Sequence, residues 1–250
     1  MPRIILLGTG TGLPDHDRGH THLGWDGPGG PLLVDAGGST YQRLLQVGID
    51  PQSLAGVVVT HSHCDHINGL PSLIFSLRLG GRVTPLPIYG LEPTLAILRA
   101  TIEAMRVEFH VPLTWHAIEA GAIIPLAEGW QLRTALTEHS RPCLALRFEA
   151  PAHDQAVVYS ADTEPCPAVA ALAVGAQVLI HEATTPAPFA GHTTPRQSGE
   201  VAATAGVKRL ILVHYSPRWT MPEADALAEV RAGGFTAQAE VGRDGQVIEL

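Results

Sequence analysis

A run of six residues at positions 61–66 constrains this sequence more than any other feature. It reads His-Ser-His-Cys-Asp-His and directly follows the apolar segment 57–60. A turn after a buried strand can direct alternate side chains toward one point, and neutral imidazoles and carboxylates are ligands of Zn²⁺, Mn²⁺ and Fe²⁺. A solvated histidine-rich turn is the alternative. So many ligand types in so short a run favour a site for two metal ions.

Short apolar runs that end in polar or glycine residues predict buried β-strands. These runs cover residues 4–7, 32–34, 57–60, 157–159, 178–180 and 210–213. Three of them are followed closely by His61, Asp162 and His214. Because sites in layered α/β folds assemble at the carboxyl ends of strands, we expect these three residues to converge.

Apolar residues spaced three and four apart predict helices between the strands. One begins after Asn68 and ends at Gly80 and Gly81, a second covers residues 91–105, and a third begins at Pro195 after Thr194. A fourth is predicted from residues 220–223, Thr-Met-Pro-Glu, which have the form of a capping box, and it closes at residues 233–234, Gly-Gly.

The bulk composition indicates one α/β domain over residues 1–250, because no low-complexity segment or long linker divides the chain. The net charge of −8, with only 16 scattered Lys and Arg residues, disfavours a broad nucleic-acid surface. Cys64, Cys143 and Cys166 have no CxxC spacing, which favours a reducing cytoplasm. The first apolar run is too short for secretion or for spanning a membrane.

The six residues 61–66 match the HxHxDH signature of the metallo-β-lactamase superfamily, which this chain resembles. The resemblance implies a four-layered αββα sandwich with a binuclear site at one edge. It also implies zinc, with manganese or iron as alternatives, and it disfavours antibiotic hydrolysis because Asp162 stands where β-lactamases often have cysteine. The implied ligands are His61, His63 and His139 for one ion, Asp65, His66 and His214 for the other, and Asp162 as the bridge.

Later segments narrow the resemblance to the ribonuclease Z branch. They are Leu-Ile-His-Glu-Ala-Thr at 179–184, Gly-His-Thr-Thr at 191–194 and His-Tyr-Ser-Pro-Arg-Trp at 214–219, with Leu-Gly-Thr-Gly at 7–10 and Asn-Gly-Leu-Pro at 68–71. The resemblance implies that Glu182 orients His192, which protonates the leaving oxygen. Asp65 is the expected proton acceptor for the attacking water. Alternatively, Glu182 caps the helix at Pro195. His181 is expected to support the site.

Ribonuclease Z proteins that process tRNA usually carry a basic, glycine-rich arm between the third histidine and the bridging aspartate, and this chain lacks it. Only 22 residues separate His139 from Asp162, enough for two strands and a turn. Together with the net charge, this favours a small anionic phosphodiester as the substrate. The alternatives are an arylsulfatase-like or other small-ester hydrolase, a tRNA 3′-processing endonuclease, and a metal-binding protein without turnover. A homodimer is plausible for such a fold.

Two further groups of residues have weaker signals. A glycine- and proline-rich segment predicts a surface loop, with a lid over the substrate as the alternative, and it contains His16, His20 and His22. Trp115, Trp130 and Trp219 are expected in the core or at its rim. Trp219 follows His214 closely, so stacking on a substrate base or aryl ring is its alternative role. Arg218 is a candidate to contact an anionic substrate, with a surface salt bridge as the alternative.

Overall fold

The computed structural model describes residues 1–107 and 111–250. Within these ranges the strands form two seven-stranded sheets. In spatial order, the first sheet contains β14 (Val247–Glu249), β1 (Arg3–Gly8), β2 (His22–Asp26), β3 (Leu32–Val34), β4 (Gly56–Val59), β5 (Leu86–Gly90) and β6 (Leu113–Ala117). The second contains β13 (Gln238–Val241), β12 (Arg209–Val213), β11 (Val178–Glu182), β10 (Gln155–Tyr159), β9 (Leu144–Ala150), β8 (Gln131–Leu136) and β7 (Ile123–Pro125).

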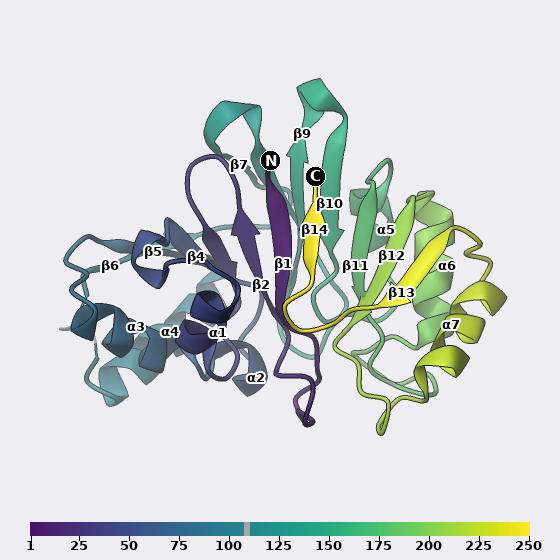
Figure 1. Cartoon of the computed structure of the whole chain (residues 1–250), viewed down its shortest axis with the longest axis horizontal. Coiled ribbons are helices and arrows are strands. Elements are labelled where there is room, and N and C mark those ends of the chain that lie inside the picture. The colour runs from purple at the N-terminus through teal and green to yellow at the C-terminus, as the bar shows by residue number, and fades with distance from the viewer. Residues whose placement is uncertain (108–110) are drawn as a thin grey trace.

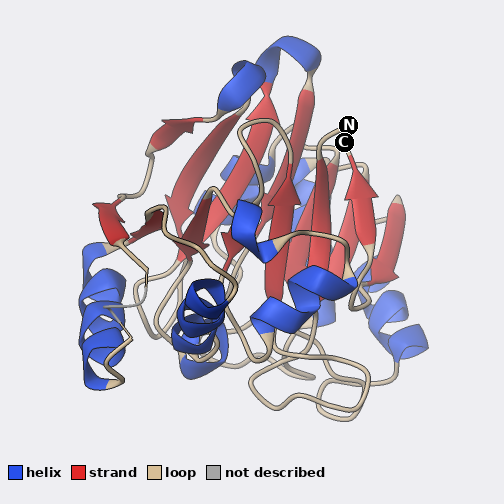
Figure 2. Ribbon diagram, turned by 60° about the vertical axis from the view of Figure 1, so that its left-hand side comes forward, coloured by secondary structure: helices blue, strands red, loops and turns tan. Residues whose placement is uncertain are grey.

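Helices cover the outer face of each sheet, which gives the predicted four layers (Figures 1 and 2). The first sheet is covered by α1 (Thr40–Gln46), α3 (Leu70–Leu79) and α4 (Glu92–Ala104), and α2 (Cys64–Ile67) lies at its edge. The second is covered by α5 (Pro167–Ala173), α6 (Pro195–Ala205) and α7 (Glu223–Ala232). None of the helices in the described ranges is long and apolar enough to span a membrane.

Three hydrophobic cores alternate with the two sheets, and the strand sequences explain why. On β1, Ile4 and Leu6 enter the core between the sheets, whereas Ile5 and Leu7 enter the core beneath the helices of the first half. Successive side chains of a strand point to opposite faces, so a strand buried on both faces must be apolar throughout. This accounts for the continuous apolar runs in the sequence, all six of which form strands.

The predicted helices at 70–79, 91–105 and from Pro195 are confirmed within a residue or two. The predicted capping box at residues 220–223 is wrong. The Thr220 hydroxyl donates to the carbonyls of Ala183 and Thr184, and α7 begins at Glu223 without a side-chain cap. The capping box lies instead at α6, where Thr194 and Gln197 bond reciprocally. A tertiary contact therefore outweighed the local helix signal of Thr220.

The segment that contains His16, His20 and His22 is only partly the predicted surface loop. The side chain of His16 is exposed, but His22 is buried and begins β2. Burial lowers the pKa of His22 to about 4, so its ring is neutral. The error arose because glycines and prolines on either side concealed the short apolar strand that His22 begins.

Candidate metal centre and active site

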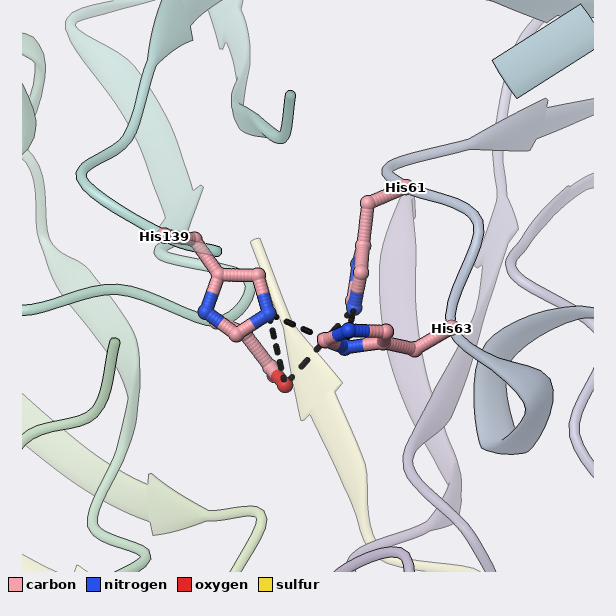
Figure 3. Close-up of side chains that lie close together, drawn as sticks. His61, His63 and His139 are labelled. Carbon is pink, nitrogen blue, oxygen red and sulfur yellow. Dashed lines mark hydrogen bonds and ion pairs between the residues drawn. The ribbon is translucent and has the colours of Figure 1, made fainter. Parts of the chain in front are cut away.

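The segment 61–66 leaves the first sheet at the end of β4 and enters the short helix α2. His61 is fully buried, and His63 precedes the helix in an extended conformation. The His63 Nδ1 atom lies 3.2 Å from His61 Nε2 and 3.0 Å from His139 Nε2. Figure 3 shows the three rings pointing toward one another. Local chain geometry thus directs two of these rings to one point, and the second sheet supplies the third.

These three nitrogens and a carboxylate oxygen of Asp162 lie within 4.8 Å of one another. Burial and the neighbouring ring of His66 hold the pKa of His61 well below its usual range. Burial and the nearby His139 likewise lower the pKa of His63. Neutral imidazoles that present lone pairs to a shared space are the donor set of a divalent transition-metal ion. The residues therefore fit such an ion.

A second cluster adjoins the first and consists of Asp65, His66 and His214. The Asp65 Oδ2 atom lies 3.3 Å from His214 Nε2 and 3.6 Å from His66 Nε2. Asp162 reaches both clusters, because its Oδ1 lies 3.6 Å from His66 Nε2 and its Oδ2 lies 3.8 Å from His61 Nε2.

Two atoms at this site are buried without a hydrogen-bond partner among the residues the structure describes: His66 Nε2 in the second cluster and Asp162 Oδ1 between the clusters. Burying polar atoms without partners is costly, so such atoms need a ligand to satisfy them. Their position between the two clusters fits a second metal ion. The seven residues named from the sequence as metal ligands are thus brought together at one edge of the sandwich.

Asp35 supports the cluster from the first sheet, although it was not among the residues predicted from the sequence. This fully buried carboxylate accepts hydrogen bonds from the backbone and hydroxyl of Thr60 and contacts His66 Nδ1 at 2.8 Å. A bond of this kind fixes the ring so that the other nitrogen faces the ligand. Asp35 directly follows the strand β3, so the rule that identified His61, Asp162 and His214 could also have identified Asp35.

The backbone is strained where it delivers residues to the site. Asp35, Ala161 and His214 have φ angles of 61°, 51° and 48°, in the left-handed region that non-glycine residues seldom adopt. Such a conformation costs on the order of 1–3 kcal/mol and persists only where surrounding contacts fix it. All three lie just beyond the carboxyl ends of strands, so the sharp turns that direct side chains into the site are a source of this strain.

Glu182 and His192 form the pair that the sequence predicted. Glu182, fully buried at the end of β11, accepts hydrogen bonds from the backbones of Thr163, Thr184 and Thr193. Its Oε1 lies 3.0 Å from His192 Nδ1. Burial alone lowers the pKa of His192, but the hydrogen bond and charge of Glu182 outweigh it and raise the pKa.

The alternative role of Glu182 as a helix cap is not observed, because Thr194 caps α6. A ring nitrogen of His192 lies within 4.8 Å of a ligand atom of Asp162 and of His214. His192 is therefore beside the metal clusters. His181 is buried, and its Nδ1 contacts the Glu182 carbonyl at 2.8 Å, which is a supporting position.

Thr184 connects the acid pair to the metal clusters. Its hydroxyl lies 2.5 Å from Glu182 Oε2 and 2.7 Å from His214 Nδ1. A hydroxyl has one hydrogen, and a carboxylate can only accept, so Thr184 donates to Glu182 and accepts from His214 Nδ1. The His214 Nε2 atom is thereby left as a lone pair facing Asp65. Thr184 is the last residue of the motif at 179–184, but no role was predicted for it from the sequence.

A cleft of about 500 Å³ opens beside these residues. His63, Asp65, Asp162, His192 and His214 form its floor, while its walls are mainly apolar. No lysine or arginine is among its described lining residues. A smaller hollow of about 230 Å³ adjoins it and is lined by Arg218 and Asp15. The cleft has the size and mixed lining of a small-molecule site.

Comparison with known proteins identifies the family. The family model for the beta-lactamase superfamily domain matches residues 31–215, which include all seven candidate ligands. This chain belongs to the beta-lactamase superfamily. The ribonuclease Z of Methanothermobacter thermautotrophicus is 31% identical to this superfamily member over 278 residues, covering 89% of each chain. The resemblance to the ribonuclease Z-like branch is thereby confirmed.

Solved structures of the superfamily agree with the fold. The metallo-beta-lactamase fold protein YhfI from Bacillus subtilis has a TM-score of 0.84 at 22% identity, covering 100% of this chain and 99% of that one. The short form of human tRNase Z has a TM-score of 0.79 at 22% identity, covering 99% and 98%. The expected αββα class is confirmed, as is a metal-dependent hydrolase that acts on ester bonds. Divalent metal ions are its implied cofactors.

Proposed function

We propose that this superfamily member is a binuclear phosphodiesterase that acts on small molecules. The observation that carries the proposal is the placement of two ligand clusters, joined at Asp162, beside the Glu182 and His192 pair in one cleft. A phosphodiester uses every part of this arrangement, because it has charged oxygens to neutralise and a leaving alkoxide to protonate.

His61, His63 and His139 would hold one ion, and Asp65, His66 and His214 the other, with Asp162 shared. Imidazole and carboxylate donors favour zinc, with manganese and iron as the other candidates. Divalent ions at such a site lower the pKa of water and neutralise phosphoryl oxygens. Asp65 is the proposed proton acceptor for the attacking water, because its carboxylate lines the cleft and its side chain is 16% exposed.

His192 is the proposed general acid. Glu182 fixes its Nδ1, so Nε2 is the nitrogen free to donate a proton to the leaving oxygen. Glu182 is enclosed by hydrogen-bond donors, which hold its carboxylate in place. Its role is therefore to position His192 and to stabilise the imidazolium, without itself touching the substrate.

Processing of tRNA is the second candidate, because the curated relative at 31% identity is named ribonuclease Z. Two features favour a small substrate instead. The 22 residues from 140 to 161 hold only β9, β10, the short turn Pro151–His153 and the ends adjoining the site. Segments that grip phosphate backbones need clustered Lys and Arg residues, and the described cleft lining has none.

The test is to purify the protein, measure its metals, and compare hydrolysis of bis(p-nitrophenyl) phosphate, p-nitrophenyl sulfate and a 3′-extended tRNA. We expect close to two zinc ions per chain and turnover of the phosphodiester. His61→Ala removes a candidate ligand and should lower both metal content and turnover, and its matched control is His153→Ala, because His153 is exposed on a distant turn. A protein that stays inert on the diester after loading with Zn²⁺ or Mn²⁺ refutes the proposal, and faster trimming of the tRNA replaces it with the second candidate.

A further inference from the structure

Trp219 lines the cleft and remains 56% exposed, and so does Phe189, which is 65% exposed. By contrast, Trp25 and Trp130 are buried between the sheets, with their ring centroids 4.7 Å apart. Leu13 lines the same cleft and is also exposed, and both residues line the adjoining hollow that contains Arg218. Trp219 and Leu13 thus form an apolar patch at the border between the two cavities.

The order of residues along the cleft places this patch relative to the proposed chemistry. Asp65 contacts His214, whose ring stacks on that of His192 at 5.6 Å between centroids. Gly12, next to Leu13, lies so close to Asp65 that a Cβ atom on it would be 3.2 Å from Oδ2. Asp65, His214 and His192 thus form a row along the cleft, and the patch lies at the Asp65 end of this row.

The opposite end of the row has its own apolar residue. Phe189 lies beside His192, whose backbone N–H donates to the Phe189 carbonyl in a tight turn. Because His192 is the proposed proton donor to the leaving oxygen, the leaving group of a diester would lie at the Phe189 end. The attacking water takes the position opposite the leaving group, so the group that stays on the phosphorus projects sideways from this axis, and Leu13 and Trp219 line the adjoining part of the cleft.

The turn that carries Trp219 is held firmly. The backbone N–H groups of Trp219 and Thr220 both donate to the carbonyl of Ser216. The Thr220 hydroxyl donates to the carbonyls of Ala183 and Thr184, so the turn is fixed to the segment that supports Glu182 and His214. An aromatic ring on a well-supported backbone loses little conformational entropy when it binds a flat partner. Stacking depends little on which base or aryl ring is bound.

We infer that Trp219 and Leu13 form a subsite for a flat aromatic group, a nucleobase or an aryl ring, on the retained side of the phosphodiester. The inference rests on the proposed function and deepens it by naming the substrate class. Arg218 and Asp15 both line the adjoining hollow, so their charges offset each other and the inference concerns the aromatic group alone. The subsite makes Trp219 a specificity-determining residue.

The test compares three diesters with the same p-nitrophenolate leaving group and different retained groups: methyl, phenyl and thymidine 5′. Because the leaving group is the same, the need for protonation by His192 is the same for all three esters. We expect the wild type to show a kcat/KM about tenfold or more higher for at least one aromatic ester than for the methyl ester. Trp219→Ala should lose that preference and change the methyl ester less than about twofold, while Trp219→Phe should retain most of it.

Leu79→Ala is the matched control, because Leu79 is an exposed apolar residue at the end of α3, outside the cleft lining. A preference for the phenyl ester alone identifies an aryl substrate, and one for the thymidine ester alone identifies a nucleobase. Equal rates on all three esters, or a preference that survives Trp219→Ala, overturn the subsite and leave the phosphodiesterase proposal intact.

A binding measurement separates failure of the subsite from failure of the proposed function. Calorimetry with phenylphosphonate and methylphosphonate on the metal-loaded protein should show about tenfold tighter binding of the phenyl compound, and Trp219→Ala should abolish the difference. If this preference is present and no ester is hydrolysed, the subsite stands and the phosphodiesterase proposal fails. If neither protein distinguishes the two phosphonates, the subsite is refuted whatever the turnover.

Discussion

The two halves of the chain supply the candidate ligands in different ways. In the first half, four of them lie within residues 61–66, where a strand end and a four-residue helix direct them together. In the second half, His139, Asp162 and His214 come from three separate strand ends, and their positions depend on the pairing of the second sheet. Local chain geometry positions the ligands of the first half, and tertiary structure positions those of the second half.

Asp162 is the point where this difference should have the largest effect, because its carboxylate reaches both clusters. Asp162→Ala should remove most of the bound metal and lower turnover by more than about a thousandfold, beyond the 10- to 100-fold typical of changes around the ligands. Metal analysis and initial rates on bis(p-nitrophenyl) phosphate measure it. Asp17→Ala, at an exposed carboxylate, is the control. A variant that keeps two ions per chain would show that the clusters are independent.

His192→Ala should have the next largest effect, and it tests the second half alone. Loss of the proposed general acid should reduce kcat by about 10²- to 10⁴-fold for diesters with poor leaving groups, and much less for p-nitrophenolate. Metal content should stay unchanged. A leaving-group series at fixed pH provides the measurement. Equal loss across the series would argue that His192 contributes to metal binding, consistent with its nearness to Asp162 and His214.

The two supporting residues give the smallest effects and the sharpest contrast between the halves. Asp35→Asn should weaken metal affinity by about 10- to 100-fold, because a charged partner of His66 is lost, and leave the leaving-group dependence unaltered. Thr184→Val should cost about tenfold in affinity and also steepen that dependence, because Thr184 bonds both His214 and Glu182. Chelator competition and the same ester series measure both. If the two variants change metal affinity and leaving-group dependence in the same way, Asp35 and Thr184 do not have distinct roles.

The sequence predicted most of the fold because both faces of the central strands are buried, so their apolar runs stand out. It predicted the cluster at 61–66 from residue types, and the convergence of Asp162 and His214 with it from their positions after strands. His139 needed the family resemblance, because spacing carries no information on which strand ends meet. Asp35 follows β3 directly, but the strand-end rule was not applied to it.

For Thr220 and Thr184 the cause of the error is the same, which is that each hydroxyl bonds tertiary partners rather than local ones. Thr220 had a suitable helix-capping pattern, but its hydroxyl bonds the carbonyls after β11. His22 looked like part of a polar loop, but it is buried at the start of β2. Thr184 was left without a role, because a hydroxyl that bridges two distant residues has no sequence signature.

The turn Pro151–His153 lies between β9 and β10, at the end of the sandwich away from α2 and the strand ends that carry the site (Figure 1). Its residues are exposed, and the strands on either side are anchored in the core. Additional chain could be inserted there without moving His139 or Asp162. The scaffold is modular at this turn. A binding segment engineered into this position would change which substrates the enzyme binds and would leave its chemistry on a bound ester unchanged.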